Sequence, residues 1–221
     1  MGGMWQSGDG GPEGTQAGAQ SSTTDKGQAR KRSILDAAKN ILVEEGFAEL
    51  SFRRIAQRAG IKVGNVTYYY PNKEQLMDDL AVYIFERWDA GFRRRVPEHL
   101  TDKMEIFDYS IRYMIEENKR ERTNALLQEM WAMASRSEVV MRMLDVFYSR
   151  MRSWIDDMLA KVNPTLSERS RQLRAGLITA QIEGLMVLIG PRRIPHDELR
   201  GLEEEAVAAI RQLAIAEDRA C

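Results

Sequence analysis

Two short apolar-striped segments on either side of a single glycine constrain the fold of this chain more than any other feature. The first follows Ser51 and carries apolar residues at helical spacing until Gly60; the second covers residues 63–70 and stops before Pro71. Serine favours the N-cap of a helix, glycine commonly follows its last turn, and the residue before a proline disfavours helical backbone. The pattern predicts two short helices joined by a tight turn, a geometry that presents one helix to the major groove of DNA.

A third helical pattern precedes this pair and has a basic start. Apolar residues recur at three- and four-residue spacing over about residues 28–45, and Gly46 follows them. From Lys26 to Lys73 there are ten Lys or Arg and four acids, a net charge of +6, although the whole chain carries −1. A basic region inside an otherwise acidic chain is the charge distribution expected when one part of a protein binds nucleic acid.

The rest of the chain also has helical patterns. The composition, with 43% apolar residues and only six prolines, favours helix over strand, and the predicted fold class is all-α with about nine helices in total. Asn72 and Gln75 form a capping box that begins a long helix. Further helices are expected at about residues 103–117, 121–135, 137–161, 166–190 and 196–217.

Three regions follow from these patterns. Residues 1–28 are rich in Gly, Ser, Thr and Gln and have almost no branched apolar side chains, so a disordered tail is expected there. Residues 29–75 form the predicted helix-turn-helix DNA-binding domain of three helices. Residues 76–218 form a larger helical bundle, predicted to bind a ligand and to dimerise.

Several other classes of protein are not indicated. The N-terminus lacks the pattern of a signal peptide, and the apolar stretch Gly176–Gly190 is too short to span a bilayer, so no membrane association is expected. A single cysteine, Cys221, fits a reducing cytoplasm. His99 and His196 stand without Cys or carboxylate at ligand spacing, so neither a metal nor another cofactor is predicted. No catalytic constellation stands out, and the chain is not expected to be an enzyme.

The basic region contains four motifs within about residues 30–80: Ile34-Leu-Asp-Ala-Ala, Gly46-Phe, Ser51-Phe-Arg-Arg-Ile-Ala-Gln-Arg-Ala-Gly-Ile and Tyr69-Tyr-Pro-Asn-Lys-Glu-Gln-Leu76. These motifs closely resemble the TetR/AcrR family of helix-turn-helix transcriptional regulators. The resemblance implies an Ω-shaped all-helical homodimer in the cytoplasm, which binds operator DNA through its N-terminal domain and an inducer through a divergent C-terminal domain.

The resemblance also assigns roles to single residues. It implies phosphate contacts for Ser51, Arg53, Tyr69 and Lys73, whose hydroxyls and cations suit phosphate oxygens. Arg30, in the basic start of the first helix, belongs to the same predicted DNA-binding set. The residues placed near base edges are Lys62, Val63, Gly64, Asn65 and Tyr68.

Among these, Asn65 can pair with adenine and Lys62 with guanine, while Gly64 permits close backbone approach. Two residues depart from the family pattern. Lys62 stands where a capping Ser or Thr is usual, and Thr67 where an aromatic residue is usual. The first departure weakens a helix cap by about 1 kcal/mol.

In the C-terminal region only the distribution of residue types indicates a site. Deformable methionines and aromatic residues gather in its middle helices and suit an adaptable apolar pocket, although each is more often a core residue. The predicted pocket residues are Tyr109, Tyr113, Gln128, Trp131, Phe147, Met151 and Gln181. Gln181 and Glu183 interrupt an apolar helix and could orient a ligand or satisfy a neighbouring helix, and Glu183 could also face solvent or the dimer interface.

The last two helical patterns suit a subunit interface. Small residues four apart lie on one face of the penultimate helix and allow close approach of another helix, and apolar residues repeat along the last one. The predicted interface residues are Gly176, Leu177, Ala180, Gly184, Leu188, Val207, Ile210 and Leu213. Packing within one chain is the alternative for these faces.

The sequence therefore predicts a DNA-binding transcriptional regulator, with a ligand-responsive repressor of a palindromic operator as the leading hypothesis. An activator, or a regulator controlled by a protein partner, is the alternative within the same fold. A helical enzyme or carrier that kept the DNA-binding region as a relic is a third hypothesis, which intact Arg53, Tyr69 and Lys73 oppose.

Overall fold

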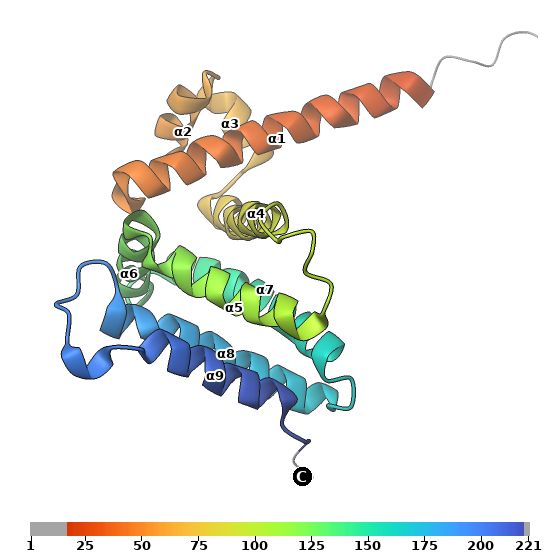
Figure 1. Ribbon diagram of the computed structural model, residues 1–221. Helices are drawn as coiled ribbons and strands as arrows, with labels where there is room; N and C mark the ends of the chain where they lie inside the picture. Colours follow the sequence, from red (N-terminus) through yellow and green to blue (C-terminus); the bar gives the residue numbers. More distant parts are fainter. Residues whose placement is uncertain (1–16, 219–221) are drawn as a thin grey trace, which may run out of the picture.

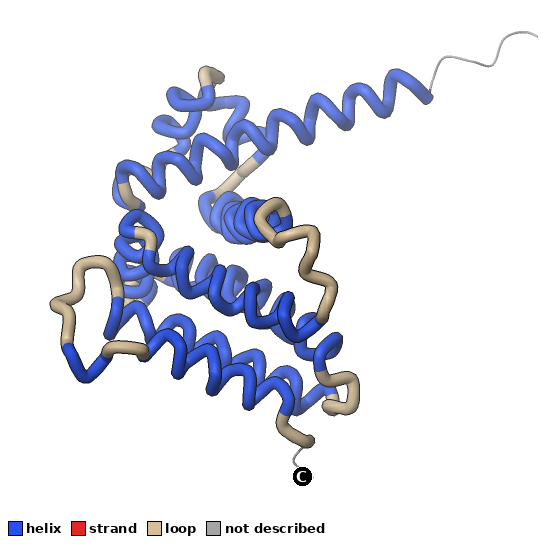
Figure 2. Tube along the Cα trace, in the orientation of Figure 1, coloured by secondary structure: helices blue, strands red, loops and turns tan. Residues whose placement is uncertain are grey.

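The computed structural model describes residues 17–218, with side chains from Asp25 onward, and this part of the chain contains helices and no strand (Figure 2). Figure 1 shows α2 and α3 packed on one side of α1, α4 on the other side, and α5 to α9 stacked beyond α4. The α-helices are α1 (Ala17–Glu45), α2 (Phe52–Ala59), α3 (Val63–Tyr69), α4 (Lys73–Arg93), α5 (Lys103–Lys119), α6 (Glu121–Ala134), α7 (Glu138–Val162), α8 (Glu168–Ile189) and α9 (Leu202–Ile215). Two single turns of 3₁₀ helix, η1 (Phe47–Glu49) and η2 (Asp197–Leu199), complete the order.

The all-α fold class is confirmed, and the caps expected at Ser51 and Asn72 are present together with three others. Ser51, Asn72, Asp102, Ser137 and Ser167 each accept a hydrogen bond from a backbone N–H in the first turn of the helix that follows. Each such cap typically stabilises a helix by about 1 kcal/mol. The chain is thus cut into helices at positions that local chemistry determines.

The first helix is longer than expected. The tail was predicted to run to residue 28, but residues 17–28 continue α1 beyond the part that packs on α2 and α4 (Figure 1). Adding a residue to an existing helix is far less costly than nucleating one, so the packed part of α1 can extend through a polar stretch. Residues 1–16 of the predicted tail lie outside the described residues.

Two hydrophobic clusters hold the molecule together. The first joins α1, η1, α2, α3 and the start of α4 to Met130 of α6 and to Val140 and Met143 of α7. The second joins the end of α4 to α5, α7, α8 and α9. The predicted boundary between residues 75 and 76 falls within α4, near its start, and α4 contributes side chains to both clusters.

Candidate nucleic-acid interface and ligand cavity

One face of α3 is buried against the rest of the protein, and the opposite face is exposed. Val66 is fully buried, and Tyr70, which follows the helix, is 1% exposed. The side chains predicted to reach base edges therefore point away from the core. All five of these residues are exposed: Lys62, Val63, Gly64, Asn65 and Tyr68. Tyr68 is 78% exposed, so both its ring and its hydroxyl are available to a partner.

Tyr70 fastens the end of α3 to α1 and α4. Its hydroxyl donates to Asp79 Oδ2 at 3.2 Å, and Lys31 Nζ lies 5.4 Å from the centre of its ring. Lys31 also forms an ion pair with Asp79 at 3.6 Å. Burial, with the Asp79 carboxylate adding to it, raises the pKa of Tyr70 and keeps its hydroxyl a donor. The last of the three consecutive tyrosines is therefore an anchor, and the first two reach the surface.

The start of α3 has Lys62 in place of the usual capping Ser or Thr. Lys62 is the N-cap residue, and its side chain makes no capping hydrogen bond, as its chemistry predicts. Its carbonyl still accepts from Asn65 N at 2.9 Å, so the first turn is closed by the backbone. Thr67 is exposed and its hydroxyl donates back to Gly64 O at 3.2 Å. Neither residue prevents the helix from forming.

The predicted phosphate contacts flank α3. Ser51 and Arg53 are exposed at the start of α2, and Tyr69 lies edge to face with Tyr68 at a centroid distance of 5.1 Å. Ser51 Oγ accepts from Arg54 N, and its O–H remains a donor for an outside group.

Lys73 and Arg30 complete the predicted DNA-binding set. Lys73 opens α4, where backbone amides and the helix dipole favour an anion. Its Nζ lies 4.3 Å from the centre of the Phe47 ring, and partial burial lowers the pKa of Lys73. The Phe47 ring therefore positions this cation. Arg30 is exposed on α1.

The other two arginines of α2 have a different role. Arg54 Nε donates to Glu45 at 2.8 Å, and Arg58 Nη1 donates to the same carboxylate at 2.7 Å. Arg58 also pairs with Glu44, and this hydrogen bond lowers the pKa of the Glu44 carboxyl. These contacts tie α2 to the last turn of α1, so Arg53 is the arginine of α2 that remains for DNA.

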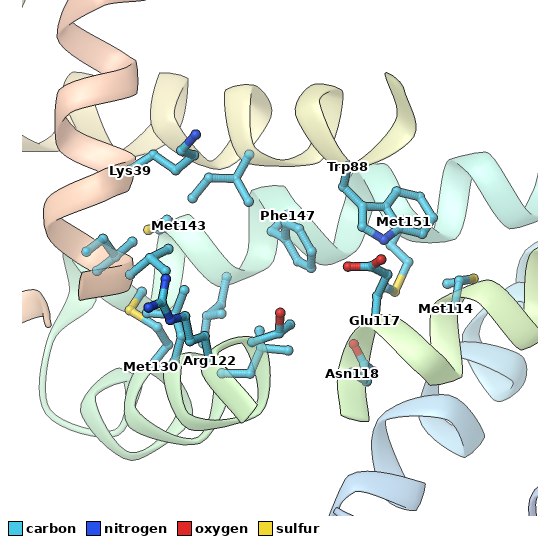
Figure 3. Close-up of a pocket in the computed structure, with 17 residues that line it drawn as sticks. Lys39, Trp88, Met114, Glu117, Asn118, Arg122, Met130, Met143, Phe147 and Met151 are labelled. Atoms are coloured by element: carbon cyan, nitrogen blue, oxygen red, sulfur yellow. The ribbon is translucent and has the colours of Figure 1, made fainter. Parts of the chain in front are cut away.

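A cavity of about 190 Å³ lies between α1, α4, α5, α6 and α7 (Figure 3). Figure 3 shows Phe147 near its middle, Trp88 and Met114 at one end and Arg122 and Met130 at the other. Apolar side chains dominate its walls. The lining residues are Lys39, Leu42, Val43, Ile84, Trp88, Met114, Glu117, Asn118, Arg122, Thr123, Leu126, Leu127, Met130, Met143, Leu144, Phe147 and Met151.

Two of the seven predicted pocket residues, Phe147 and Met151, line this cavity. The other five, Tyr109, Tyr113, Gln128, Trp131 and Gln181, do not. Gln181 is exposed on α8 and does not line this cavity, which corrects the prediction that it orients a ligand there. Helical spacing shows which residues share a face, but a helix with neighbours on several sides offers more than one buried face.

The remaining predicted pocket residues make contacts within the bundle. The Tyr109 hydroxyl donates to Arg95 O at 2.7 Å, and the Tyr113 hydroxyl accepts from Arg95 Nη1 at 3.0 Å. Gln128 donates to Asn124 Oδ1 at 2.6 Å. These bonds join the segment after α4 to α5, and one turn of α6 to the next.

Glu183 accepts hydrogen bonds from two neighbouring helices, which decides among the roles left open for it. This side chain is buried, and its two oxygens accept from Asn118 Nδ2 at 3.1 Å and from the Tyr148 hydroxyl at 3.0 Å. Trp131 Nε1 donates to the same hydroxyl at 2.8 Å. Burial raises the pKa of Glu183, against the opposing effect of these two donors. The network links α5, α6, α7 and α8 beside the cavity, which Asn118 also lines.

The predicted interface residues divide between the two last helices. On α8, Leu177 and Leu188 are 55% and 48% exposed, and Ala180 and Gly184 are exposed beside them, while Gly176 is half-buried. On α9 the prediction is wrong for two residues, because Val207 and Ile210 are buried in the second cluster of their own chain. Leu213 is half-buried against that cluster. α9 packs against α5, α7 and α8 of its own chain, which accounts for the difference.

α8 is also long and apolar enough to cross a membrane by length and composition, a test that core helices of water-soluble proteins pass as well. It contains the buried Arg174 and the buried Glu183, both hydrogen-bonded to other helices or to the segment after α9. The described residues include no group of three or more His, Cys, Asp or Glu that could hold a metal ion.

Comparison with known proteins agrees with this geometry in both halves of the chain. Residues 34–80 match the family model for bacterial regulatory proteins of the tetR family, and residues 111–212 match the C-terminal model of BetI-type transcriptional repressors. A curated HTH-type transcriptional regulator of Xanthobacter autotrophicus is 25% identical over 167 residues, which are 73% of this chain and 80% of that protein. Other curated relatives match over shorter stretches, from 26% to 34% of their own length.

Solved structures share the fold. A Rhodococcus protein described as a TetR-family transcriptional regulator has a TM-score of 0.62 at 22% identity, over 82% of this chain and 94% of that chain. The multidrug binding protein EbrR, in complex with imidazole, has a TM-score of 0.54 at 22% identity, over 85% and 96%. The relatives are transcriptional regulators and not enzymes. With its helix-turn-helix and its helical C-terminal half matched separately, the chain belongs to the TetR family of transcriptional regulators.

Proposed function

We propose that this protein is a cytoplasmic, ligand-responsive repressor whose homodimer binds a near-palindromic operator and leaves it when a small molecule binds the C-terminal domain. The observation that carries the proposal is the outward face of α3. Lys62, Asn65 and Tyr68 are exposed there while Val66 and Tyr70 hold the helix from below. A short helix that is packed on one face, and whose other face no described residue covers, is suited to the major groove.

The surrounding residues support separate roles in phosphate contact and in base recognition. Ser51, Arg53, Tyr69 and Lys73 flank α3 and carry hydroxyl or cationic donors, which hold the phosphate backbone without reading sequence. Asn65 offers the amide that pairs with adenine in the major groove. In a twofold dimer the two α3 helices read half-sites about one helical turn apart, or a multiple of it, which accounts for the palindrome.

The cavity supports control by a small molecule. Its walls come from α4 as well as from α5, α6 and α7, so a ligand that fills it also bears on the helix that connects the two hydrophobic clusters. A ligand that binds the DNA-free arrangement more tightly lowers operator affinity by the same coupling free energy, typically about 1–3 kcal/mol. The cavity favours this version over a regulator controlled by a protein partner, in which side chains would fill the space.

Selection of genomic DNA fragments by the purified protein tests the proposal. We expect enrichment of fragments that share an inverted repeat, and we expect the Asn65→Ala, Lys62→Ala double variant to enrich a different set. A reporter gene behind an enriched fragment should be expressed less when the protein is present. Fragments without a common motif would refute sequence-specific binding, and increased expression would replace the repressor by an activator.

A further inference from the structure

One wall of the cavity is formed by α1, which belongs to the proposed DNA-binding region. Lys39, Leu42 and Val43 of α1 line the same space as Leu127 of α6 and Phe147 of α7. Leu42 is 1% exposed and belongs to the cluster that holds α2 and α3 on α1. We infer that the small-molecule site of the proposed repressor is completed by α1 and takes a ligand with a neutral, apolar body, which touches the DNA-binding region directly.

The chemistry of the walls sets the class of ligand. Twelve of the seventeen lining residues are apolar, and three carry charge. Lys39 Nζ already bonds Asp36 at 3.3 Å, and Glu117 pairs with Arg120 at 3.0 Å. Arg122 stands in the field of Glu44, whose pKa it helps to lower. Lys39 and Glu117 thus already have partners, and Arg122 is exposed to solvent. Against walls that are mostly apolar a charged ligand would lose hydration, whereas an uncharged apolar molecule loses only unfavourable contact with water.

The last turn of α1 makes side-chain hydrogen bonds with α2 on one side and leads into a contact with α6 on the other. A ligand that moves this turn therefore also moves α2 and α3. On one side Glu45 binds Arg54 and Arg58 of α2. On the other side Glu129 Oε1 of α6 accepts from Phe47 N at 3.2 Å, directly after Gly46.

The space for this contact is tight. An added Cβ on Gly46 would lie 3.2 Å from the same Glu129 oxygen, and the glycine holds a positive φ of 88°. A ligand that separates α1 from α6 therefore acts on α2 and α3 through α1, in addition to any movement of α4. Because coupling is reciprocal, DNA that fixes α2 and α3 also changes this wall of the cavity.

Binding of the neutral fluorescent probe N-phenyl-1-naphthylamine to the full-length protein tests the inference. Val43→Trp extends a bulky ring from the α1 wall and Leu127→Trp from the α6 wall. Each is expected to weaken probe binding by about tenfold or more, because the ring occupies space that the probe needs. The matched control is Val82→Trp, on α4, where the valine is equally half-buried and does not line the cavity. It should stay within about twofold of the unsubstituted protein.

A second arm measures the probe with saturating selected operator DNA. We expect DNA to weaken probe binding about 5- to 150-fold, the usual range of allosteric coupling. Should Val43→Trp fail to fold, Val43→Ala takes its place, with at least a twofold change in probe affinity expected and with Val82→Ala as its control.

The outcomes separate this inference from the proposed function. Probe binding that responds to Leu127 but not to Val43 overturns the contact with α1 and leaves the regulator intact. A probe that does not bind the unsubstituted protein overturns the apolar site. Failure of the protein to select any DNA overturns the proposed function, whatever the probe does.

Discussion

At the scale of single residues, the exposed face of α3 and the first residue of α4 should differ in what they contribute to DNA binding. Asn65→Ala removes an amide that reads a base edge, so we expect a changed preference among operator variants. Lys73→Gln removes a cation at a helix N-terminus, so we expect weaker binding to every sequence and a salt dependence whose slope is smaller by about 1.8 for two lysines per dimer. Fluorescence anisotropy over a salt series measures both effects.

The control for this pair is Lys103→Gln, since Lys103 is an exposed lysine that likewise begins a helix, in the C-terminal bundle. It should leave the slope unchanged. Equal and sequence-independent losses from Asn65→Ala and Lys73→Gln would show that their roles are assigned wrongly. Lys73 also packs on Phe47, so thermal unfolding of each variant must accompany the binding data.

Glu183 gives a residue-scale prediction about pH. Its pKa is raised in the folded protein, so between the ordinary value of 4.5 and the raised value the folded state binds more protons than the unfolded state. The stability contributed by the protonated, buried form is therefore present below that window and is lost as pH rises through it. Glu183→Gln keeps the shape without the titration, so its stability relative to the unsubstituted protein should increase with pH.

Urea unfolding at several values from about pH 5 to about pH 8 measures this difference. The control is Glu86→Gln on α4, which replaces an exposed carboxylate by the same amide. Parallel pH profiles for Glu183→Gln and the unsubstituted protein would contradict the prediction.

At the scale of helices, local chemistry was sufficient to predict most boundaries, and packing was needed for the rest. Ser51, Gly60 and Pro71 mark the ends of α2 and α3 in the sequence, and the structure agrees with them. The start of α1 at Ala17 could not be predicted, because its first turns carry no apolar stripe and follow only from helix propagation.

The candidate sites divide in the same way. The exposed face of α3 could be predicted, because the apolar stripe of a short helix marks its buried face and the remaining residues must lie on the opposite one. Of the cavity, only Phe147 and Met151 were predicted, because Leu42 and Val43 are ordinary core residues of α1 by pattern and only tertiary packing brings them to the same space. The same limit explains why Val207 and Ile210 were assigned to the wrong side of α9.

The junction of α8 and α9 gives a prediction at this scale. Arg174 is buried on α8, and its guanidinium donates to the carbonyls of Leu213, Ala216 and Glu217, each at 2.7 Å. These carbonyls lie at the end of α9, where a helix lacks internal donors and favours a cation. Arg174→Met leaves them unsatisfied, so we expect a loss of roughly 2–4 kcal/mol in the free energy of unfolding.

Chemical denaturation of Arg174→Met and of Arg169→Met measures that loss. Arg169 is exposed on the same helix, and its substitution should change stability by less than about 0.5 kcal/mol. Similar stabilities for the two variants would show that Arg174 does not hold the end of α9.

At the scale of the whole molecule, the exposed face of α8 is where a second copy should bind. Leu173, Leu177, Val187 and Leu188 are about half exposed along this helix, an apolar surface for which the described part of one chain provides no cover. Gly184 lies among them, and a Cβ added there meets nothing within 4 Å in its own chain. If a small residue is needed at this position, the need comes from close approach of a partner helix.

Gly184→Leu therefore separates dimerisation from folding. Leucine favours helix over glycine by roughly 0.8 kcal/mol, so the single chain should unfold at the same or a higher temperature, while the bulkier side chain should keep two α8 helices apart. Sedimentation should show the mass of one chain at concentrations where the unsubstituted protein has the mass of two, and operator affinity should fall because one α3 reads one half-site. Met141→Leu, at an exposed position on α7, should change neither mass nor affinity. A Gly184→Leu protein that remains dimeric on DNA would place the twofold axis elsewhere on the molecule, away from α8.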